Sequence, residues 1–492
     1  MKKLLSIGFV LIYFLSTNTL ANNKEVPLLI THLKNTTPII NDLKQLTDEI
    51  GSRMTGSPGN IKSIEWALKK FKTAGVEAHK ESFVMPRAWS ELSNKVKVFN
   101  DNINFSPNVV TMPFTSKTQH SGLSAPLIDL QKGDKDAFLK NNNLKGKWLL
   151  IETALLTDES GVHGLFQEYL DAVDIEGSAV KLGAAGIIYM SSRPKNLLYR
   201  HLPSNGADNK LPIIVMERES ALKAQRLLAQ GHQLSLTAQL NISDESSYTA
   251  DNVIAEIKGS TYPDEIVLIS AHIDSFDLGT GALDNGANVS MIIDIARQMQ
   301  KLNIKPKRTI RFALFNGEEQ GIYGSYGYTL KHANELDKHI MTTTIDLGTG
   351  KINGFYTNGR EEITAALNKV LEPVQDLGPF THINEAVVGT DNYDFMMQGV
   401  ANLVADQGNA NYASNYHAQS DTFDKVDQKQ LKLNAAIIAA LTLGYANIEN
   451  VTWQRQSSAQ VVNMVKEFNI EASMKTFGLY KSWTNNTRGI KH

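Results

Sequence analysis

Seven side chains between positions 272 and 417 have the types and spacing to bind metal ions and activate water. They are His272 and Asp274 in SAHIDSF, Asp284 in GALDNGA, Glu318 and Glu319 in LFNGEEQG, Asp346 in TTIDLGT, and His417 in NYHAQSDT. Because the chain has no cysteine, a metal site must use imidazole nitrogens and carboxylate oxygens, which suit zinc. Two ions sharing a water would lower its pKa and polarise a substrate carbonyl, which is the chemistry of a hydrolase. Co²⁺ or Mn²⁺ could occupy the same ligands.

The positions of these residues predict separate roles. Asp284 follows His272 closely, so its loop can fold back over the same strand end and bridge the two ions. His272 and Asp346 would then bind one zinc ion. Glu319 and His417 would bind the other.

Two further carboxylates are predicted to act beside the metals. Adjacent residues at a strand end point in different directions, so Glu318 can face the water while its neighbour binds metal. Glu318 is therefore predicted to be the general base, taking a proton from the water and delivering it to the leaving amine. Asp274 lies two residues after His272 and is predicted to accept the imidazole N–H, which would fix the tautomer of that ligand.

Each motif has an ordinary structural explanation when it is taken alone. A His-x-Asp is usually a surface pair, Glu-Glu in a turn is usually solvated, and Asp284-Asn285-Gly286 is typical of a tight turn. Those explanations do not account for the occurrence of all of them in one segment. The other histidines lack partnered spacing and are expected on the surface or in loops: His32, His79, His120, His163, His201, His232, His332, His339, His382 and His492. A serine nucleophile is not supported, because no Gly-x-Ser-x-Gly motif occurs.

Alternating strands and helices would bring the ligands together. From Asn252 on, the apolar β-rich runs NVIAEIKG, EIVLISAHID, TIRFALFNGEE and MTTTIDLG are separated by helical patterns such as NVSMIIDIARQMQKL. This order predicts an α/β fold with a doubly wound mixed sheet flanked by helices. Ligands of such sheets sit at the carboxyl ends of strands, where His272, Glu318 and Asp346 fall.

The sequence pattern before this region differs from the pattern within it and indicates a separate domain. The segment from about 125 to 240 has short strands, turns and helices but no group of metal-ligand residue types, so it is expected to be an inserted domain. With 492 residues the chain exceeds a single core. The predicted divisions are a signal peptide at 1–21, an N-terminal part of the catalytic domain at 22–122, the inserted domain at 123–245, the catalytic domain at 246–450 and a C-terminal extension at 451–492. No chemistry is expected from the extension.

The first residues are typical of an export signal. Met1-Lys2-Lys3 precede an apolar run from Leu4 to Leu15 and short residues up to Ala21, which predicts a signal peptide and a periplasmic or secreted protein. No later stretch reaches 18 uncharged apolar residues, so no membrane anchor is expected. The formal net charge of −2 offers no electrostatic case for nucleic acid as a partner.

Nearly the whole chain after the leader resembles the co-catalytic zinc exopeptidase family of carboxypeptidase Q and bacterial aminopeptidases. The blocks DEIGSRMTGSPGN, PKRTIRFALFNGEEQGIYGS and VGTDNYDFMMQGVANLVADQGNANYASNYHAQSDTF carry the resemblance. It implies the zinc exopeptidase fold with a β-rich protease-associated insertion, two Zn²⁺ per chain, and peptide or dipeptide substrates. The family's five ligands, its general base and its accessory acid match the residues assigned above, none of them substituted.

The resemblance implies two further features of the site. The peptide bond after the bridging residue, Asp284-Asn285, is expected to be cis. Tyr416 precedes the ligand His417 and is proposed to donate to the oxyanion of the scissile carbonyl, with a packed loop tyrosine as the equal alternative.

Specificity and assembly stay open at this stage. No arginine set that would select an acidic terminal residue is identifiable, and release from the amino end or the carboxyl end is undecided. Relatives often form homodimers, but no residue here argues for one. A non-catalytic binding protein on the same fold and a two-metal phosphoesterase are the alternative functions.

Overall fold

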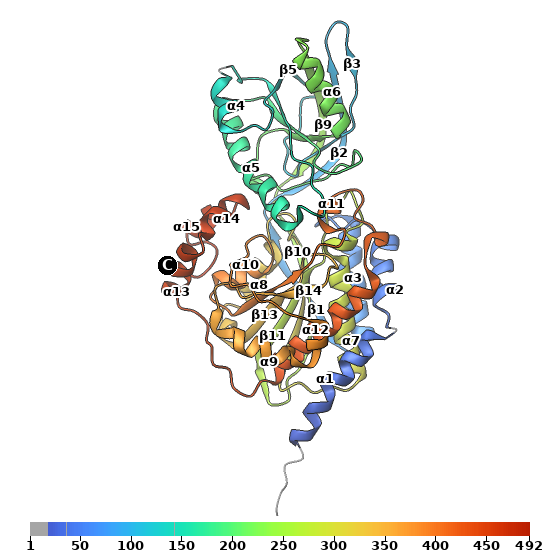
Figure 1. Cartoon of the computed structure of the whole chain (residues 1–492), viewed down its shortest axis with the longest axis vertical. Coiled ribbons are helices and arrows are strands. Elements are labelled where there is room, and N and C mark those ends of the chain that lie inside the picture. Colours follow the sequence, from blue (N-terminus) through green and yellow to red (C-terminus); the bar gives the residue numbers. More distant parts are fainter. Residues whose placement is uncertain (1–17, 36, 142) are drawn as a thin grey trace, which may run out of the picture.

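The computed structural model describes residues 18–35, 37–141 and 143–492, which form a large lower and a smaller upper lobe (Figure 1). Each lobe is built on one mixed sheet with helices beside it. The predicted mixed α/β class is therefore correct. The predicted signal peptide lies outside the described residues except for 18–21, which begin helix α1 (Asn18–Lys34). Within the described ranges, no helix has the length and apolar character needed to cross a membrane.

The sheet of the large lobe has seven strands, with four parallel strands at its centre. In spatial order the strands are β1 (Glu77–Met85), β10 (Tyr248–Ile257), β12 (Arg308–Phe315), β11 (Tyr262–His272), β13 (His339–Thr344), β15 (Asn402–Gln407) and β14 (Ile352–Tyr356). Strands β12, β11, β13 and β15 run parallel, while β1, β10 and β14 pair antiparallel at the flanks. The carboxyl ends of the four central strands therefore meet at one edge.

Helices cover both faces of this sheet. One face is packed by α7 (Ala287–Lys301) and α12 (Gln428–Asn447), with α1, α2 (Ile39–Lys44), α3 (Pro58–Thr73) and α9 (Thr364–Leu371) completing that layer. On the other face, α8 (Tyr323–Lys331) and α10 (Asn392–Met397) contribute Tyr328 and Phe395 to a second core. Helix α3 begins earlier than its apolar pattern alone suggests, because Ser57 accepts from the Asn60 N–H and Pro58 occupies the first turn.

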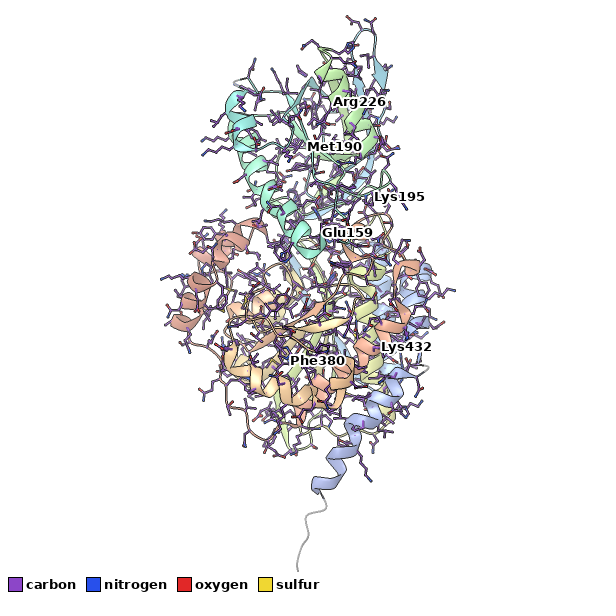
Figure 2. All side chains as sticks on the ribbon, in the orientation of Figure 1. Glu159, Met190, Lys195, Arg226, Phe380 and Lys432 are labelled. Carbon is purple, nitrogen blue, oxygen red and sulfur yellow. The ribbon has the colours of Figure 1, made fainter. Side chains whose placement is uncertain are left out.

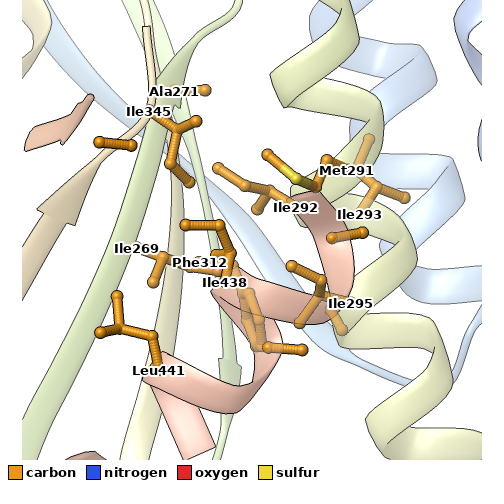
Figure 3. Packing of buried hydrophobic residues seen from close by; sticks show 14 of the residues in the cluster. Ile269, Ala271, Met291, Ile292, Ile293, Ile295, Phe312, Ile345, Ile438 and Leu441 are labelled. Atoms are coloured by element: carbon orange, nitrogen blue, oxygen red, sulfur yellow. The ribbon is translucent and has the colours of Figure 1, made fainter. Parts of the chain in front are cut away.

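The main core lies between the sheet and helices α7 and α12. Figure 3 shows side chains of the strands facing those of the two helices; Ile269, Phe312, Ile292, Ile295 and Ile438 are among them, and all are fully buried. Burying one such side chain stabilises the fold by about 1.5–3 kcal/mol, so this packing provides a rigid platform under the strand ends.

The smaller lobe is a mixed α/β unit and not a mainly β domain. Its eight strands are ordered β3 (Asn104–Phe105), β2 (Ala88–Phe99), β9 (Ser235–Glu245), β5 (Leu123–Asp129), β6 (Trp148–Ile151), β7 (Gly186–Met190), β8 (Ile213–Met216) and β4 (Val109–Thr111). Its helices are α4 (Lys135–Lys140), α5 (Gly161–Leu182) and α6 (Arg218–Ala229). Arg226 on α6 lies in the outer part of this lobe, whereas Glu159, just before α5, lies where the lobes meet (Figure 2).

The second sheet begins well before residue 123, where the inserted domain was expected to start. Strand β2 pairs antiparallel with β9, from Ala88 opposite Glu245 to Phe99 opposite Ser235. This pairing joins residues far apart in sequence, so the local texture of 88–111 did not reveal it. The sheet places residues 88–245 together in the smaller lobe.

The C-terminal extension is helical and folds back onto the large lobe. Its helices α13 (Ser458–Glu467), α14 (Ile470–Thr476) and α15 (Tyr480–Thr484) lie beside the lower end of α5 in Figure 1. Buried side chains of these helices form one cluster with Ile322, Val388, Tyr393, Met396 and Met397 of the large lobe.

Candidate metal centre

The predicted ligands converge at the carboxyl edge of the central strands. His272 ends β11, Asp346 follows β13, and the Glu318-Glu319 pair follows β12. The fifth ligand, His417, lies in the loop after α11 (Tyr412–Asn415). Rigid neighbouring strands thus supply most of the set, as the parallel-sheet rule requires.

Three of these side chains form the first ligand group. The Nε2 atom of His272 lies 3.0 Å from Oδ1 of Asp284 and 2.9 Å from Oδ1 of Asp346. All three residues are buried, and their donor atoms are close enough to one another to bind a single cation.

The second ligand group shares Asp284 with the first. Nε2 of His417 lies 2.9 Å from Oε2 of Glu319 and 3.3 Å from Oδ2 of Asp284. The other oxygen of Glu319, Oε1, is buried without a hydrogen-bond partner. Because Oδ1 of Asp284 faces the first group and Oδ2 the second, this carboxylate has the geometry of a bridge.

The predicted bridging residue, Asp284, is held in place by two residues that the sequence analysis missed, Asp421 and Arg53. Asp284 lies in the turn η3 (Ala282–Gly286), and its peptide bond to Asn285 is cis, as the resemblance implied. The carboxylate of Asp421 accepts from the N–H groups of Leu283 at 2.7 Å and Asp284 at 3.1 Å. The guanidinium of Arg53 donates to the carbonyls preceding the turn, at 2.6 Å to Thr280 and 2.8 Å to Gly281.

Asp274 has a different contact from the predicted one. The backbone carbonyl of Asp274, not its carboxylate, lies 3.1 Å from Nδ1 of His272 and accepts its N–H. The carboxylate is 3.7 Å from that nitrogen, beyond ordinary hydrogen-bond distance. Its oxygens accept instead from the backbone N–H groups of Glu318 and Glu319, each at 3.3 Å, and from the Thr55 hydroxyl at 3.0 Å. The tautomer of His272 is thus set by the backbone, and the acid holds the Glu-Glu turn.

The electrostatics of the two ligand groups fit a divalent cation. Burial raises the pKa of Glu319 to about 7 and also raises the pKa of Asp346. For Asp284 burial acts in the same direction, but hydrogen bonds from His272 and His417 hold the pKa of that carboxyl below its usual range. Clustered buried carboxylates resist ionisation together, and a cation among them would remove that cost. Two imidazole nitrogens and three carboxylates match the donor preference of zinc.

Burial likewise raises the pKa of Glu318 well above its usual range. This carboxyl is not a member of either ligand group. A carboxyl group that does not bind metal and has a raised pKa is suited to hold a proton between two steps of a reaction.

The smaller lobe binds the predicted ligand His417 directly. Nδ1 of His417 donates to the carbonyl of Arg200 at 2.9 Å, and the Arg200 N–H donates to the carbonyl of His417 at 3.2 Å. The Nδ1 atoms of His417 and His201 are 3.1 Å apart, and Nε2 of His201 lies 3.0 Å from Glu168. These contacts leave Nε2 of His417 free to face the ligand group.

His201 lies in a loop, as expected, but its spacing gave no sign of the partners that it has there. It is buried between Glu168 and His417, with its ring 4.3 Å from that of Tyr169. Its partners come from α5 and from the far end of the chain, so no local spacing could have indicated them. His339 is buried as well and His332 is partly buried, and both contact Tyr328.

Tyr416 lies over its neighbour, the predicted ligand His417. The two rings are stacked with centroids 3.5 Å apart, and the Tyr416 hydroxyl is 3.3 Å from that of Tyr169. The carbonyl of Tyr416 accepts from Nε of Arg193 at 2.9 Å. Arg193 also pairs with Glu168, at 3.1 Å. Residues of the smaller lobe thus complete one wall of the centre.

Residues 252–442, which span these ligands, match peptidase family M28. A peptidase M28 precursor from Shewanella amazonensis superposes with a TM-score of 0.79 at 26% identity, covering 89% of this chain and 99% of that one. Residues 252–442 form a peptidase M28 domain. Carboxypeptidase Q of Bos taurus is 26% identical over 422 residues, which cover 83% of this chain and 85% of the relative.

Other proteins similar to this chain differ in the activity that their names state. A probable lipoprotein aminopeptidase of Mycobacterium tuberculosis is 21% identical over 453 residues, covering 85% of both chains. The zinc aminopeptidase BSAP of Bacillus subtilis shares the fold, with a TM-score of 0.64 at 21% identity, covering 85% of this chain and 95% of that one. The M28 assignment confirms the prediction of a metallo-exopeptidase. Both carboxypeptidases and aminopeptidases occur among the relatives, so family membership leaves the end specificity open.

Proposed function

We propose that this protein is a two-zinc exopeptidase that releases the terminal residue of short peptides or dipeptides. The observation that carries the proposal is the shared carboxylate of Asp284, with one oxygen toward His272 and the other toward His417. His272, Asp284 and Asp346 would hold one ion, and Asp284, Glu319 and His417 the second. Zinc bound there would supply Lewis acidity and a lowered pKa for a bound water.

Glu318 acts in this proposal as the general base. It takes a proton from the attacking water and passes it to the nitrogen of the leaving amine. Asp274 keeps Glu318 in place, because its carboxylate accepts from the backbone N–H of both glutamates. Glu319 can then bind metal while its neighbour faces the water.

Tyr416 is proposed to donate its hydroxyl to the oxyanion that forms on the scissile carbonyl. Replacing it by Phe should lower kcat by about 10²-fold with KM little changed, since a donor used only in the transition state is removed. Steady-state kinetics on a dipeptide measure this. Tyr169→Phe is the matched control, because it removes only the hydroxyl behind Tyr416 and should cost much less. Near-wild-type kcat in Tyr416→Phe would identify a packing tyrosine instead.

End-blocked dipeptides test the proposed function as a whole. We expect the purified, zinc-loaded protein to hydrolyse free dipeptides and to lose this activity when one end, and only one, is blocked. An exopeptidase must recognise one charged terminus, so acetylating the amino end or amidating the carboxyl end distinguishes aminopeptidase from carboxypeptidase. Hydrolysis of peptides blocked at both ends would contradict exopeptidase action. Phosphate release from simple esters without dipeptide cleavage would favour the two-metal phosphoesterase.

The wider organisation is part of the same proposal. We place the protease-associated insertion in the smaller lobe, at 88–245, because those residues share one sheet. Export through a signal peptide at 1–21 agrees with the lipoprotein named among the relatives. Peptides are the proposed partners, and a homodimer stays a proposal from the resemblance alone.

A further inference from the structure

The C-terminal extension, residues 451–492, lies outside the segment that matches family M28 and was expected to have no chemistry. Its side chains nevertheless reach the backbone of the turn that carries Glu318 and Glu319. Arg488 makes this contact. Only 5% of its surface is exposed, which is unusual for an arginine so close to the chain end.

The guanidinium of Arg488 binds two carbonyls and one carboxylate. Nη1 donates to the carbonyl of Gly321 at 3.1 Å, and Nη2 donates to the carbonyl of Ile322 at 2.6 Å. Nε and Nη2 form a bidentate pair with the two oxygens of Asp394, at 2.8 and 2.7 Å. The guanidinium also lies 4.8 Å from the ring centre of Tyr326, so its position is defined on several sides.

The turn that receives these bonds has a strained backbone. Gly317, Gly321 and Ile322 all have positive φ, at 76°, 128° and 60°. A β-branched residue such as Ile322 is rarely found there, and such a conformation persists only when its surroundings impose it. Within the turn, the N–H groups of Gly321 and Ile322 both donate to the carbonyl of Glu318, at 3.0 and 2.9 Å. Arg488 binds the carbonyl of the Gly321–Ile322 peptide unit, whose N–H donates to Glu318, and the carbonyl of the next unit, Ile322–Tyr323.

The extension also contacts Tyr169 of the smaller lobe and the segment that contains Gly389. The ring of Phe477, just after α14, lies 5.2 Å from that of Tyr169 on α5. A Cβ added at Gly389 would lie 2.6 Å from the Phe477 ring, so the segment before Thr390 passes directly beneath the extension. One short stretch of chain therefore touches the glutamate turn, the Gly389 segment and the smaller lobe.

We propose that the C-terminal extension is a clamp on the catalytic turn, with Arg488 as the positioning residue for Glu318 and Glu319. The clamp acts through the backbone: Arg488 fixes the carbonyl of Gly321, and the N–H of the same peptide unit, on Ile322, donates to the carbonyl of Glu318. A shift of the turn by a fraction of an ångström would move the base relative to the ligand groups. Kinetic effects of such misplacement are large even when the altered residue is remote from the chemistry. The kinetic part of this inference rests on the proposed peptidase function.

Arg488→Ala tests the clamp in the full-length, zinc-loaded protein. We expect kcat to fall by about 10–100-fold while KM and zinc content change by less than about two-fold, because substrate and metal ligands are retained. Methylguanidinium added to the variant should restore part of the lost kcat by occupying the vacated site. Because this change leaves Asp394 buried and unpaired, Arg488→Met with Asp394→Asn is the second variant, which removes both charges and should show the same loss of kcat.

Arg455→Ala is the matched control in the same extension. Arg455 donates to the carbonyl of Gln398 at 2.6 Å and pairs with Asp337 at 3.1 Å, so it anchors the extension without contacting the glutamate turn. Its loss should leave kcat near wild type. The clamp is overturned if both Arg488 variants keep wild-type kcat. Equal losses of kcat in Arg488→Ala and Arg455→Ala, without rescue by methylguanidinium, would also overturn it.

Hydrogen exchange separates failure of the clamp from failure of the proposed function. The amides of Gly321 and Ile322 should exchange at least ten-fold faster in Arg488→Ala than in wild type or Arg455→Ala. Unchanged exchange at both amides would refute the clamp whatever the activity. Faster exchange in a protein that cleaves no peptide would support the clamp and reject the proposed function alone.

Discussion

Replacing Glu318 by Gln should lower kcat by about 10²–10⁴-fold while zinc content and KM stay close to wild type. Glutamine has the same shape but cannot accept a proton, and Glu318 belongs to neither ligand group. The backbone N–H groups of the turn still donate to Asp274, so the position of the side chain should be kept. Steady-state kinetics on a free dipeptide, with metal analysis of the same sample, measure both quantities.

Glu319→Gln is the contrasting variant for this test. Glu319 lies 2.9 Å from the ligand His417 and belongs to the second ligand group, so its change should reduce zinc content together with activity. Different outcomes for two adjacent glutamates would separate the base from the ligand. Undiminished turnover in Glu318→Gln, or a loss of zinc as large as in Glu319→Gln, would reject Glu318 as the base.

Removing the metals should abolish activity. In Asp284→Ala, added Zn²⁺ should not restore it. A chelator is expected to inactivate the wild-type protein, and added Zn²⁺ should restore it. Asp284→Ala removes the one carboxylate shared by both ligand groups, so bound zinc should fall from two ions to at most one per chain, with no recovery on adding Zn²⁺. Chelation should also lower the Tm, because a ligand that binds only the folded state stabilises it.

Asp294→Asn is the control for a buried carboxylate outside the centre. Asp294 lies on α7, is fully buried, and pairs with Arg297 at 2.7 Å. This variant can lose stability but should keep both zinc ions, as measured by metal analysis after dialysis. Two retained ions and full activity in Asp284→Ala would rule out a bridging role.

Several features of the fold could be predicted because they depend on local pattern. The apolar run NVSMIIDIARQMQKL has helical spacing, and α7 spans almost the same residues. The runs that end at His272 and precede Glu318 and Asp346 contain enough apolar and β-branched residues to mark buried strands. The carboxyl ends of parallel strands lie at one edge of a sheet, so the order of strands and helices along the chain was enough to predict which edge carries the predicted ligands.

Other features depend on pairs of residues that are remote in sequence. The partner of β2 is β9, so the start of the smaller lobe could not be read from residues 88–111. His201 looked isolated because its partners are Glu168 and His417. The sequence of the extension did not indicate a role. Arg488 pairs with Asp394, which is remote in sequence, and its other contacts are backbone carbonyls, which no side-chain motif can reveal.

The sequence by itself determined the donor set, the order of the strands that present it, and the kind of reaction such donors serve. Only the tertiary structure decided that the two oxygens of Asp284 face different histidines, that the Asp274 carboxylate holds the glutamate turn, that the smaller lobe contacts His417, and that the C-terminal extension contacts the glutamate turn. The physical reason is that residue type and periodicity report local preference. A bridging carboxylate, a buried ion pair or a bond to a backbone carbonyl is instead a contact between distant segments, and its geometry exists only once the core has packed.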